Sequence, residues 1–350
     1  MTEGSRKRPE TRRDGTGRVP EGAPGADPPA GASPSVEVAL ATYNGARFLP
    51  QLLDSLFAQT HDAFRIVVSD DRSSDDTLAI VEDYARRHPG RISIVPTGSG
   101  PRGPLRNFSS IIPHLTADYV LFCDQDDVWL PHKVAVSVEA MHALDAASPE
   151  GTPNLLHTDL FVVGEDLAPI NPSAMRYQNI DPRRRAFRHL LMSNVATGCT
   201  VAANRALYRL AAPIPEEALM HDHWLALVAA AFGRIAYIDE PTILYRQHAG
   251  NAIGAKEWAA RGLLEKVRSP LVAKRNVLRR YSAQAAALVE RYGDKMREED
   301  RRAAAALGGL WRASAASRFA RLWKEGVLLQ GVIRNVALLL TVSSGTPKRG

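Results

Sequence analysis

Three carboxylates lie within four residues at Asp124, Asp126 and Asp127, directly after an apolar run from Tyr119 to Cys123. Carboxylates this close together repel one another unless a cation lies between them. Hard divalent cations prefer such oxygen ligands and often bridge them to phosphate oxygens. The pattern therefore predicts a metal site for a phosphorylated ligand, and the alternative is a capped turn with solvated acids.

A second cluster with possible chemistry is His221-Asp222-His223-Trp224, where a helix is predicted over 222–232. A carboxylate in this position can take a proton from a hydroxyl group as a general base, and it can also act as the helix N-cap. Trp224 and Trp129 could stack on a ligand, but the hydrophobic core is the favoured prediction for both. Cys123 and Cys199 are predicted to be small buried residues.

The elements that must position these clusters alternate at short intervals. Strands are predicted over 36–42, 65–69, 92–95 and 119–123, with amphipathic helices between them. This alternation is typical of an α/β fold with a mostly parallel sheet that is covered by helices on both faces. In such sheets, ligands bind beyond the carboxyl ends of the strands. The polar residues expected at these ends are Tyr43, Asn44, Asp70, Asp71 and Asp124.

Local predictions can be made for the second helix and for the later part of the chain. Ser74 or Asp75 is expected to cap the second helix. Its inward-facing residues are expected to be Leu78, Val81, Tyr84 and Ala85. Beyond Pro131 the alternation loosens, and strands are predicted over 155–163, 197–203, 235–238 and 242–245.

Composition divides the chain of 350 residues into three parts. Residues 1–35, with six Gly and six Pro, predict a disordered leader, because they cannot bury enough apolar surface to fold. Residues 36–254 have a net charge of −7 and form the predicted globular domain, and residues 255–350 have a net charge of +12 and a helical pattern. The chain shows no secretory signal and no uninterrupted run of about 18 apolar residues, and two cysteines allow at most one disulfide. A cytoplasmic location is therefore expected.

The acidic motif reads Asp124-Gln125-Asp126-Asp127-Val128-Trp129 and resembles the D-x-D motif of family 2 glycosyltransferases with the GT-A fold. Its form is similar to that of the bacterial rhamnosyltransferase-like subgroup. The likeness extends over roughly residues 36–254 through further motifs in the same order. These motifs are 41–45, 69–75, His157-Thr158-Asp159, 197–200, 220–224 and 245–248.

The resemblance implies a role for each matching residue. Donor binding falls to Ala41, Thr42, Tyr43, Asp70, Asp71, Arg106, Asp124 and Gln125. Asp126 and His248 are the implied metal ligands, and Asp222 is the implied general base. The residues implied to line the acceptor side are Thr197, Gly198, His221, His223 and Trp224. Alternatives stay open for three of them. Arg106 could be a surface arginine, His248 could be a surface polar residue, and His223 could either tune acceptor choice or perturb the pKa of the base.

The implied activity is an inverting, metal-dependent transfer of a sugar from a nucleotide-sugar to a hydroxyl of a cell-surface glycan precursor. The cofactor implied is a divalent cation, manganese or magnesium, and the acceptor is a glycan or a lipid-linked glycan. The subgroup favours rhamnose from dTDP-rhamnose as the donor. UDP-glucose or UDP-galactose as donor remains an alternative, as does a catalytically silent sugar-binding relative.

The basic tail adds a prediction about location. Basic and aromatic residues over 318–324 precede an apolar stretch over 327–340, which suits an amphipathic helix on the inner face of an anionic membrane. The alternative is a helix packed on the catalytic domain. No helix-turn-helix pattern or finger spacing is present in the sequence, so nucleic acid is not an expected partner.

Overall fold

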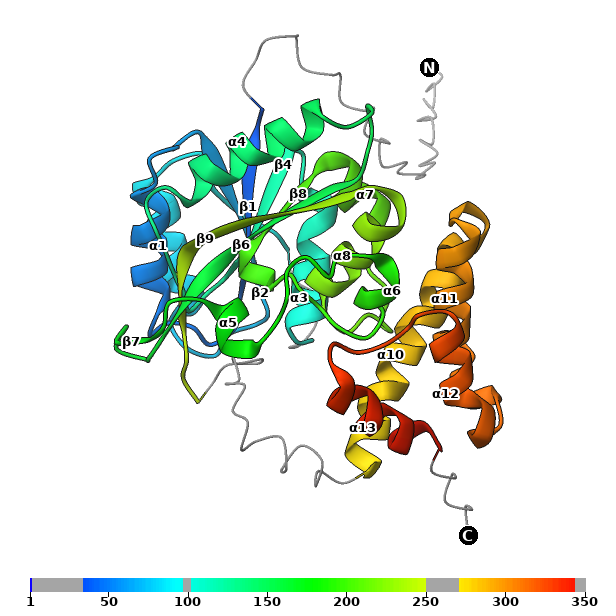
Figure 1. The fold of residues 1–350 in the computed structure, drawn as a ribbon. Coiled ribbons are helices and arrows are strands. Elements are labelled where there is room, and N and C mark those ends of the chain that lie inside the picture. Colours follow the sequence, from blue (N-terminus) through cyan, green and yellow to red (C-terminus); the bar gives the residue numbers. More distant parts are fainter. Residues whose placement is uncertain (2–33, 97–101, 250–270, 344–350) are drawn as a thin grey trace. The chain divides into compact units, whose positions relative to one another are not determined.

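The computed structural model describes residue 1 and residues 34–96, 102–249 and 271–343 (Figure 1). The leader predicted over 1–35 lies outside the described residues, apart from residues 1, 34 and 35. Residues 255–270 and 344–350 of the predicted tail lie outside them too.

The first half of the chain forms the parallel part of the sheet, as the alternation predicted. Its strands are β1 (Val36–Thr42), β2 (Phe64–Asp70), β3 (Ile92–Ile94) and β4 (Tyr119–Asp124), arranged in the order β3-β2-β1-β4. The helices between them are α1 (Leu49–Phe57), α2 (Thr77–Arg87) and α3 (Pro104–Ile111), the last followed by a 3₁₀ turn at Ile112–His114. The four strands therefore end at one edge.

The second half extends the same sheet with mixed strand directions. Its strands are β5 (Val128–Trp129), β6 (Asn154–Val163), β7 (Pro169–Asn171), β8 (Val201–Asn204) and β9 (Arg234–Arg246). β8 runs antiparallel to β4 and β6, β6 is parallel to β9, and β5 pairs antiparallel with β9. The helices of this half are α4 (Lys133–Ala146), α5 (Ala174–Gln178), α6 (Phe187–Leu190), α7 (Arg205–Ala211) and α8 (His221–Phe232).

Two strand predictions were wrong in detail. The strands predicted over 235–238 and 242–245 are one strand, β9, because its pairing with β6 continues past a bulge where Pro241 lies opposite Asp159. The strand predicted over 197–203 begins instead with a 3₁₀ turn, Gly198–Thr200. The turn is closed by the carbonyl of Thr197, which accepts hydrogen bonds from the backbone N–H and the hydroxyl of Thr200 at 2.8 and 2.7 Å.

The second helix also differs from its prediction. Asp76 is the N-cap of α2, and Asp75 accepts a hydrogen bond from the backbone N–H of Thr77 at 3.1 Å. Leu78 is exposed rather than inward-facing, because the buried face of the helix runs through Thr77, Val81 and Tyr84.

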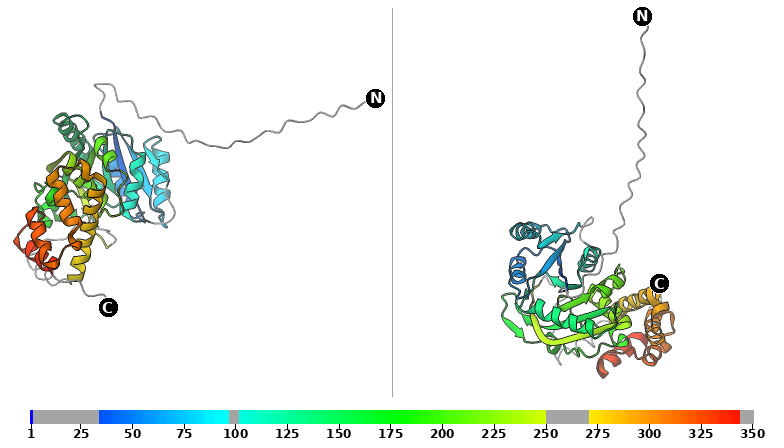
Figure 2. Two further views of the ribbon diagram at one scale, coloured as in Figure 1. Left: turned by 90° about the vertical axis from the view of Figure 1, so that its right-hand side faces the viewer. Right: turned by 90° about the horizontal axis from the view of Figure 1, so that it is seen from above.

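Alternating side chains on the strands build one hydrophobic core on each face of the sheet (Figure 2). In β1, Val38 and Leu40 pack with α1 on one face, and Ala39 and Ala41 pack with α3 on the other. Successive side chains of β1 point to opposite faces of the sheet, and both faces are buried. The strands that carry these cores end at the edge of the sheet where Asp70 and Asp124 lie.

The C-terminal helices pack with part of their surface on the core that contains Ala39, Ala41 and α3. They are α10 (Leu271–Tyr292), α11 (Glu298–Gly308), α12 (Ala315–Lys324) and α13 (Val332–Ser343), with 3₁₀ turns at Gly293–Lys295 and Leu310–Arg312. Leu288, Leu307 and Leu322 are fully buried in the same cluster as Trp224 of α8. Within the described part of the chain, no helix is long and apolar enough to cross a membrane.

Because the helices share this core, a cavity in α11 should destabilise the catalytic domain. Leu307→Ala is expected to lower the free energy of unfolding by about 2–5 kcal/mol, since it removes a fully buried side chain. Leu340→Ala, the same change at an exposed position of α13, is expected to change it by about 0.5 kcal/mol or less. Urea unfolding followed by tryptophan fluorescence checks both, and equal midpoints would contradict the shared core.

Candidate active site

The pairing of the strands places the acidic residues at one level of the sheet. Asp70 of β2 lies beside Thr42 of β1, and Asp124 of β4 lies beside Ala41. The predicted gathering of polar residues at the carboxyl edge is therefore present. The turn after β4 carries Asp126 and Asp127 into the same place.

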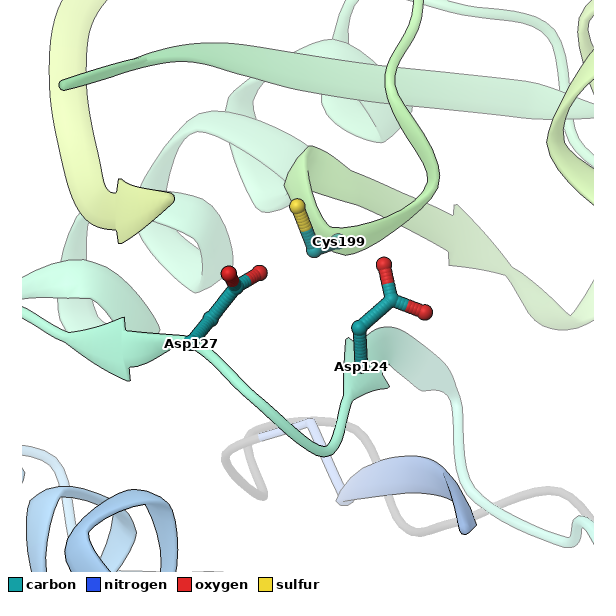
Figure 3. A group of neighbouring side chains, drawn as sticks. All are labelled: Asp124, Asp127 and Cys199. Carbon is teal, nitrogen blue, oxygen red and sulfur yellow. The ribbon is translucent and has the colours of Figure 1, made fainter. Parts of the chain in front are cut away.

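One close group at this edge consists of Asp124, Asp127 and Cys199 (Figure 3). One ligand atom of each residue lies within 4.8 Å of the others. Burial, followed by the charges of Asp126 and Asp222, raises the pKa of Asp124 to about 7. Burial also raises the pKa of Asp127 well above its usual range. Burial of these carboxyls therefore opposes their ionisation.

Asp126 projects toward the last strand and meets His248. Its carboxylate Oδ2 lies 2.8 Å from Nε2 of His248, whose ring packs against Phe48 at a centroid distance of 4.7 Å. A carboxylate oxygen and an imidazole nitrogen are both ligands of divalent transition metals. The two side chains are joined here by a direct hydrogen bond, which a cation bound between them would replace.

Arg246 supports the acidic turn from behind. Its backbone N–H donates to Asp127 Oδ1 at 3.2 Å, and its Nε donates to the carbonyl of Asp126 at 2.8 Å. Its remaining nitrogens donate to the carbonyl of Glu165 and, at 2.6 Å, to Oε1 of Gln51. Sequence reasoning assigned no role to Arg246, because nothing in its local pattern separates a buried arginine from a surface one.

Gln125 joins the acidic turn to the end of β1. Its Oε1 accepts from the N–H of Tyr43 at 2.7 Å, and its Nε2 donates to the carbonyl of Tyr43 at 2.8 Å. A Cβ at Gly45 would lie 2.2 Å from that same Oε1, so glycine is needed for this approach. Gln125 thus positions the turn, and Tyr43 remains exposed beside it.

At the ends of β1 and β2, Asp70 and Asp71 have different partners. Asp70 accepts from the hydroxyls of Thr42 and Ser73 at 2.9 and 2.6 Å, so it holds the local turn. Asp71 accepts from the backbone N–H groups of Arg102 and Gly103 through Oδ2. Its other oxygen, Oδ1, is buried, accepts no hydrogen bond among the described residues and lies 4.0 Å from Nε of Arg102.

Two neighbours complete the description of this end. The carbonyl of Thr42 accepts from the N–H of Asp71 at 2.8 Å and from Nδ2 of Asn107 at 3.0 Å. Oδ1 of Asn107 is a second buried acceptor without a partner in the described part of the chain. The sequence analysis missed Asn107, although it named its neighbour. That neighbour, Arg106, forms an exposed ion pair with Glu216 at 2.7 Å.

Asp222 lies opposite the acidic turn, in the first turn of α8. Its Oδ1 accepts from the N–H of His223 at 2.6 Å, and hydrogen bonds from Gly198 and Asn194 also favour its charged form. Burial outweighs them and raises the pKa of Asp222 to about 7. The N-cap of the helix is Met220, so the alternative in which Asp222 is the N-cap was wrong.

The other three residues of this cluster point into the core. The ring of His221 stacks on Phe108 at 3.8 Å, and burial lowers its pKa to about 3. Burial lowers the pKa of His223 to about 4, and Nε2 of this ring lies 2.6 Å from the carbonyl of Leu190. Trp224 is fully buried and donates to the carbonyl of Ala211.

These positions correct the acceptor-side prediction for Trp224, which the core encloses because α8 packs between the sheet and α10. The His223 ring lies against Leu190 and Gln284, and Nδ1 of His223 is 3.3 Å from Nε2 of Gln284. It is the backbone N–H of His223 that lowers the pKa of Asp222. Trp129 is also in the core, as favoured by the sequence.

The remaining acceptor-side residues form a narrow turn beside the base. Thr197 is half-buried and precedes Gly198 in the 3₁₀ turn. A Cβ at Gly198 would lie 3.1 Å from Cε1 of His221 and 3.6 Å from Oδ2 of Asp222. Gly198 therefore allows the turn to approach the start of α8 closely.

The fold and this site together define an α/β protein with acidic and polar side chains gathered at the carboxyl edge of its sheet. Comparison with known proteins agrees with that class. Residues 37–161 match the family described as Glycosyl transferase family 2. The chain is similar to the dTDP-rhamnosyl transferase RfbG of Shigella flexneri, with 27% identity over 227 residues, 62% of this chain and 74% of that protein.

Two further comparisons concern a shorter match and the fold. An uncharacterized glycosyltransferase of a Nostoc species is 33% identical over 110 residues, covering 31% of this chain and only 34% of its own length. The crystal structure of Staphylococcus aureus TarS residues 1–349 in complex with UDP-GlcNAc shares the fold, with a TM-score of 0.50 and 16% identity, covering 88% of this chain and 90% of that one. Over residues 37–161 the chain therefore matches glycosyltransferase family 2, and its fold is that of TarS, the GT-A fold.

The raised pKa of Asp222 predicts how stability depends on pH. The folded carboxyl keeps a proton that the unfolded chain releases, so the free energy of unfolding falls as the pH rises from about 4 to about 7. Asp222→Asn removes this dependence while keeping an oxygen that can accept from His223. In buffer with a chelator, the variant is expected to be more stable than the wild type by on the order of 2 kcal/mol at about pH 8, and by less at about pH 5.

The matched control is Asp62→Asn, the same change at an exposed carboxylate. It is expected to leave the unfolding midpoint within experimental error at both pH values. Urea unfolding at the two pH values measures all three proteins. An equal effect of Asp222→Asn at both values would show that burial does not control this carboxyl.

Proposed function

We infer that this protein is a metal-dependent, inverting glycosyltransferase that moves a hexose from a nucleotide-sugar to a hydroxyl of a glycan. The single observation that carries the proposal is that the turn Gly198–Thr200 lies against both groups: a Cβ at Gly198 would lie 3.6 Å from Oδ2 of Asp222, and Sγ of Cys199 lies within 4.8 Å of carboxylate oxygens of Asp124 and Asp127. The acidic turn thus offers carboxylates for the cation of a diphosphate, and α8 offers Asp222 as a base. An inverting transfer needs these two on opposite sides of the anomeric carbon.

The nucleotide is proposed to bind at the ends of β1 and β2. Tyr43 offers an exposed ring on which a base can stack. The buried oxygens Asp71 Oδ1 and Asn107 Oδ1 are acceptors for the N–H groups of a base. A buried acceptor that accepts no hydrogen bond costs free energy that such a bond to the base recovers.

The cation is proposed to bind Asp126 and His248, with Asp124 beside them. When bound, a divalent cation supplies positive charge that stabilises the departing diphosphate without a proton transfer. Arg246 and Gln125 hold the acidic turn in place, so these ligands are oriented before the donor arrives. Manganese or magnesium suits this donor set.

The residue proposed to act in the chemical step is Asp222. Its carboxylate accepts the proton of the acceptor hydroxyl while that oxygen bonds to the anomeric carbon. The bond from the anomeric carbon to the diphosphate oxygen breaks, and its electron pair leaves with the nucleoside diphosphate. A base with a pKa near 7 is well matched to this role, because half of it is already deprotonated near neutral pH.

Rhamnose from dTDP-rhamnose is the favoured donor, and its support is the similarity to RfbG. UDP-glucose and UDP-galactose are the alternatives, and TarS, which shares the fold, was crystallised with UDP-GlcNAc. The acceptor is proposed to be a hydroxyl of a cell-surface glycan precursor, handled at the cytoplasmic side. Retention of Asp124, Asp126 and Asp222 favours an active enzyme over a silent sugar-binding relative.

Calorimetric titration with and without manganese tests the donor and the metal together. One of dTDP-rhamnose, UDP-glucose, UDP-galactose and UDP-GlcNAc is expected to bind with manganese and to lose about tenfold or more in affinity without it. Asp126→Ala is expected to remove the effect of the metal, because it removes a proposed ligand. Asp166→Ala, at a carboxylate outside the site, is the control and should bind like the wild type.

The outcomes of this titration are distinct. Equal affinity with manganese and with chelator would overturn the metal role. Binding of a donor by a protein that transfers nothing to any glycan acceptor would favour the silent relative.

A kinetic test isolates the base. Asp222→Asn is expected to lower kcat by about 10²–10⁴-fold, because general-base catalysis is lost, while the dissociation constant of the donor stays within about twofold. The wild-type kcat/KM should rise with pH through about 7, since the protonated carboxyl cannot accept a proton. Transfer by Asp222→Asn at the wild-type rate would remove Asp222 from this role, with Asp62→Asn as the control.

A further inference from the structure

Helix α13 is apolar on two opposite faces. One face contributes Leu338 and Val342 to the hydrophobic core. The other is aliphatic and open to solvent: Val332 is 79% exposed, Ile333 and Val336 are each 50% exposed, and Leu340 is 55% exposed. Packing on the protein core explains why the first face is apolar. The second face has no packing partner among the described residues, so its apolar character needs another explanation.

The first turns of α10 extend this apolar surface. The two helices are in contact, since Nε of Arg275 donates to the carbonyl of Thr341 at 3.4 Å, and they lie beside each other in Figure 1. The exposed aliphatic residues of α10 are Leu271, Val272 and Val277. We call these seven side chains, four from α13 and three from α10, the aliphatic patch.

The helices that carry the aliphatic patch are rich in basic residues. In residues 271–289 and 309–343, nine side chains are Lys or Arg and one, Glu325, is acidic. Glu325 itself is paired with Arg302 at 3.3 Å. The acidic residues of these helices lie instead at the other end of α10 and on α11, between Glu290 and Asp300.

These features select one kind of partner. A second copy of the chain would bring the same positive charges together, which opposes an interface between copies. Nucleic acid would satisfy the charges but would offer nothing to the aliphatic side chains. A bilayer with anionic headgroups satisfies both, because acyl chains accept the aliphatic residues and phosphates accept Lys and Arg.

We propose that the aliphatic patch docks the protein on the surface of an anionic phospholipid bilayer. The axis of α13 lies along the membrane plane, its outer aliphatic side chains enter the region between headgroups and acyl chains, and the surrounding basic side chains meet lipid phosphates. The inner face of α13 stays in the protein core. Docking then needs no unfolding, and it is independent of the sugar chemistry.

Sedimentation of the full chain with vesicles tests the proposal without any donor or acceptor. The wild type is expected to bind vesicles of phosphatidylcholine with phosphatidylglycerol, to bind pure phosphatidylcholine weakly, and to be released by high salt. Ile333→Glu/Val336→Glu is expected to weaken binding by about tenfold or more, because two side chains that would enter the bilayer become charged. Both positions are half exposed, so an unfolding midpoint close to that of the wild type confirms that the variant is folded.

The matched control is Ile170→Glu, the same change at an exposed aliphatic residue of β7. It is expected to bind like the wild type. The proposal is overturned if the wild type stays in solution with anionic vesicles, or if Ile333→Glu/Val336→Glu binds as well as Ile170→Glu. It is also overturned if light scattering shows a wild-type dimer that the double variant makes monomeric, because the patch would then serve a second copy.

Discussion

The mutual repulsion of buried carboxylates is the constraint on which the rest of this site depends. Asp124, Asp126 and Asp127 share one turn, and Asp222 faces them from α8. Burial and the charges of neighbouring aspartates raise the pKa values of Asp124 and Asp127, and burial raises the pKa of Asp222. A cation and a proton from a substrate are the two species that relieve this repulsion.

The surrounding protein offsets part of the repulsion with fixed groups. Arg246 brings a guanidinium to the back of the acidic turn, and the backbone N–H groups of His223 and Gly198 point at Asp222. Lys133, fully buried, has its Nζ 4.6 Å from the centroid of the Trp129 ring, and burial lowers the pKa of that amine to about 8. These groups stabilise the architecture around the carboxylates.

The C-terminal helices also help to position Asp222. Oε1 of Gln284 on α10 accepts from the N–H of Leu219 at 2.8 Å, and its Nε2 lies 3.3 Å from His223. These two contacts hold the residues before and after Asp222 at the start of α8. A helix that bears an outer aliphatic patch at one end therefore supports the proposed base near its middle, so membrane docking and catalysis would share one rigid element.

The sequence by itself determined the parallel strands β1 to β4, the gathering of acids at their ends and the resemblance to glycosyltransferase family 2, because each follows from local periodicity or from a contiguous motif. Contiguous motifs also identified Asp126, His248 and Asp222 as candidates. Only the tertiary structure decided that Trp224 and the ring of His223 face the core, that Gln125 holds Tyr43, and that Arg246 and Asn107 belong to the site. The physical reason is that side-chain direction and burial depend on what packs against an element. For these residues that partner lies far away in the sequence, as Gln284 does for His223 and Arg246 does for Asp126.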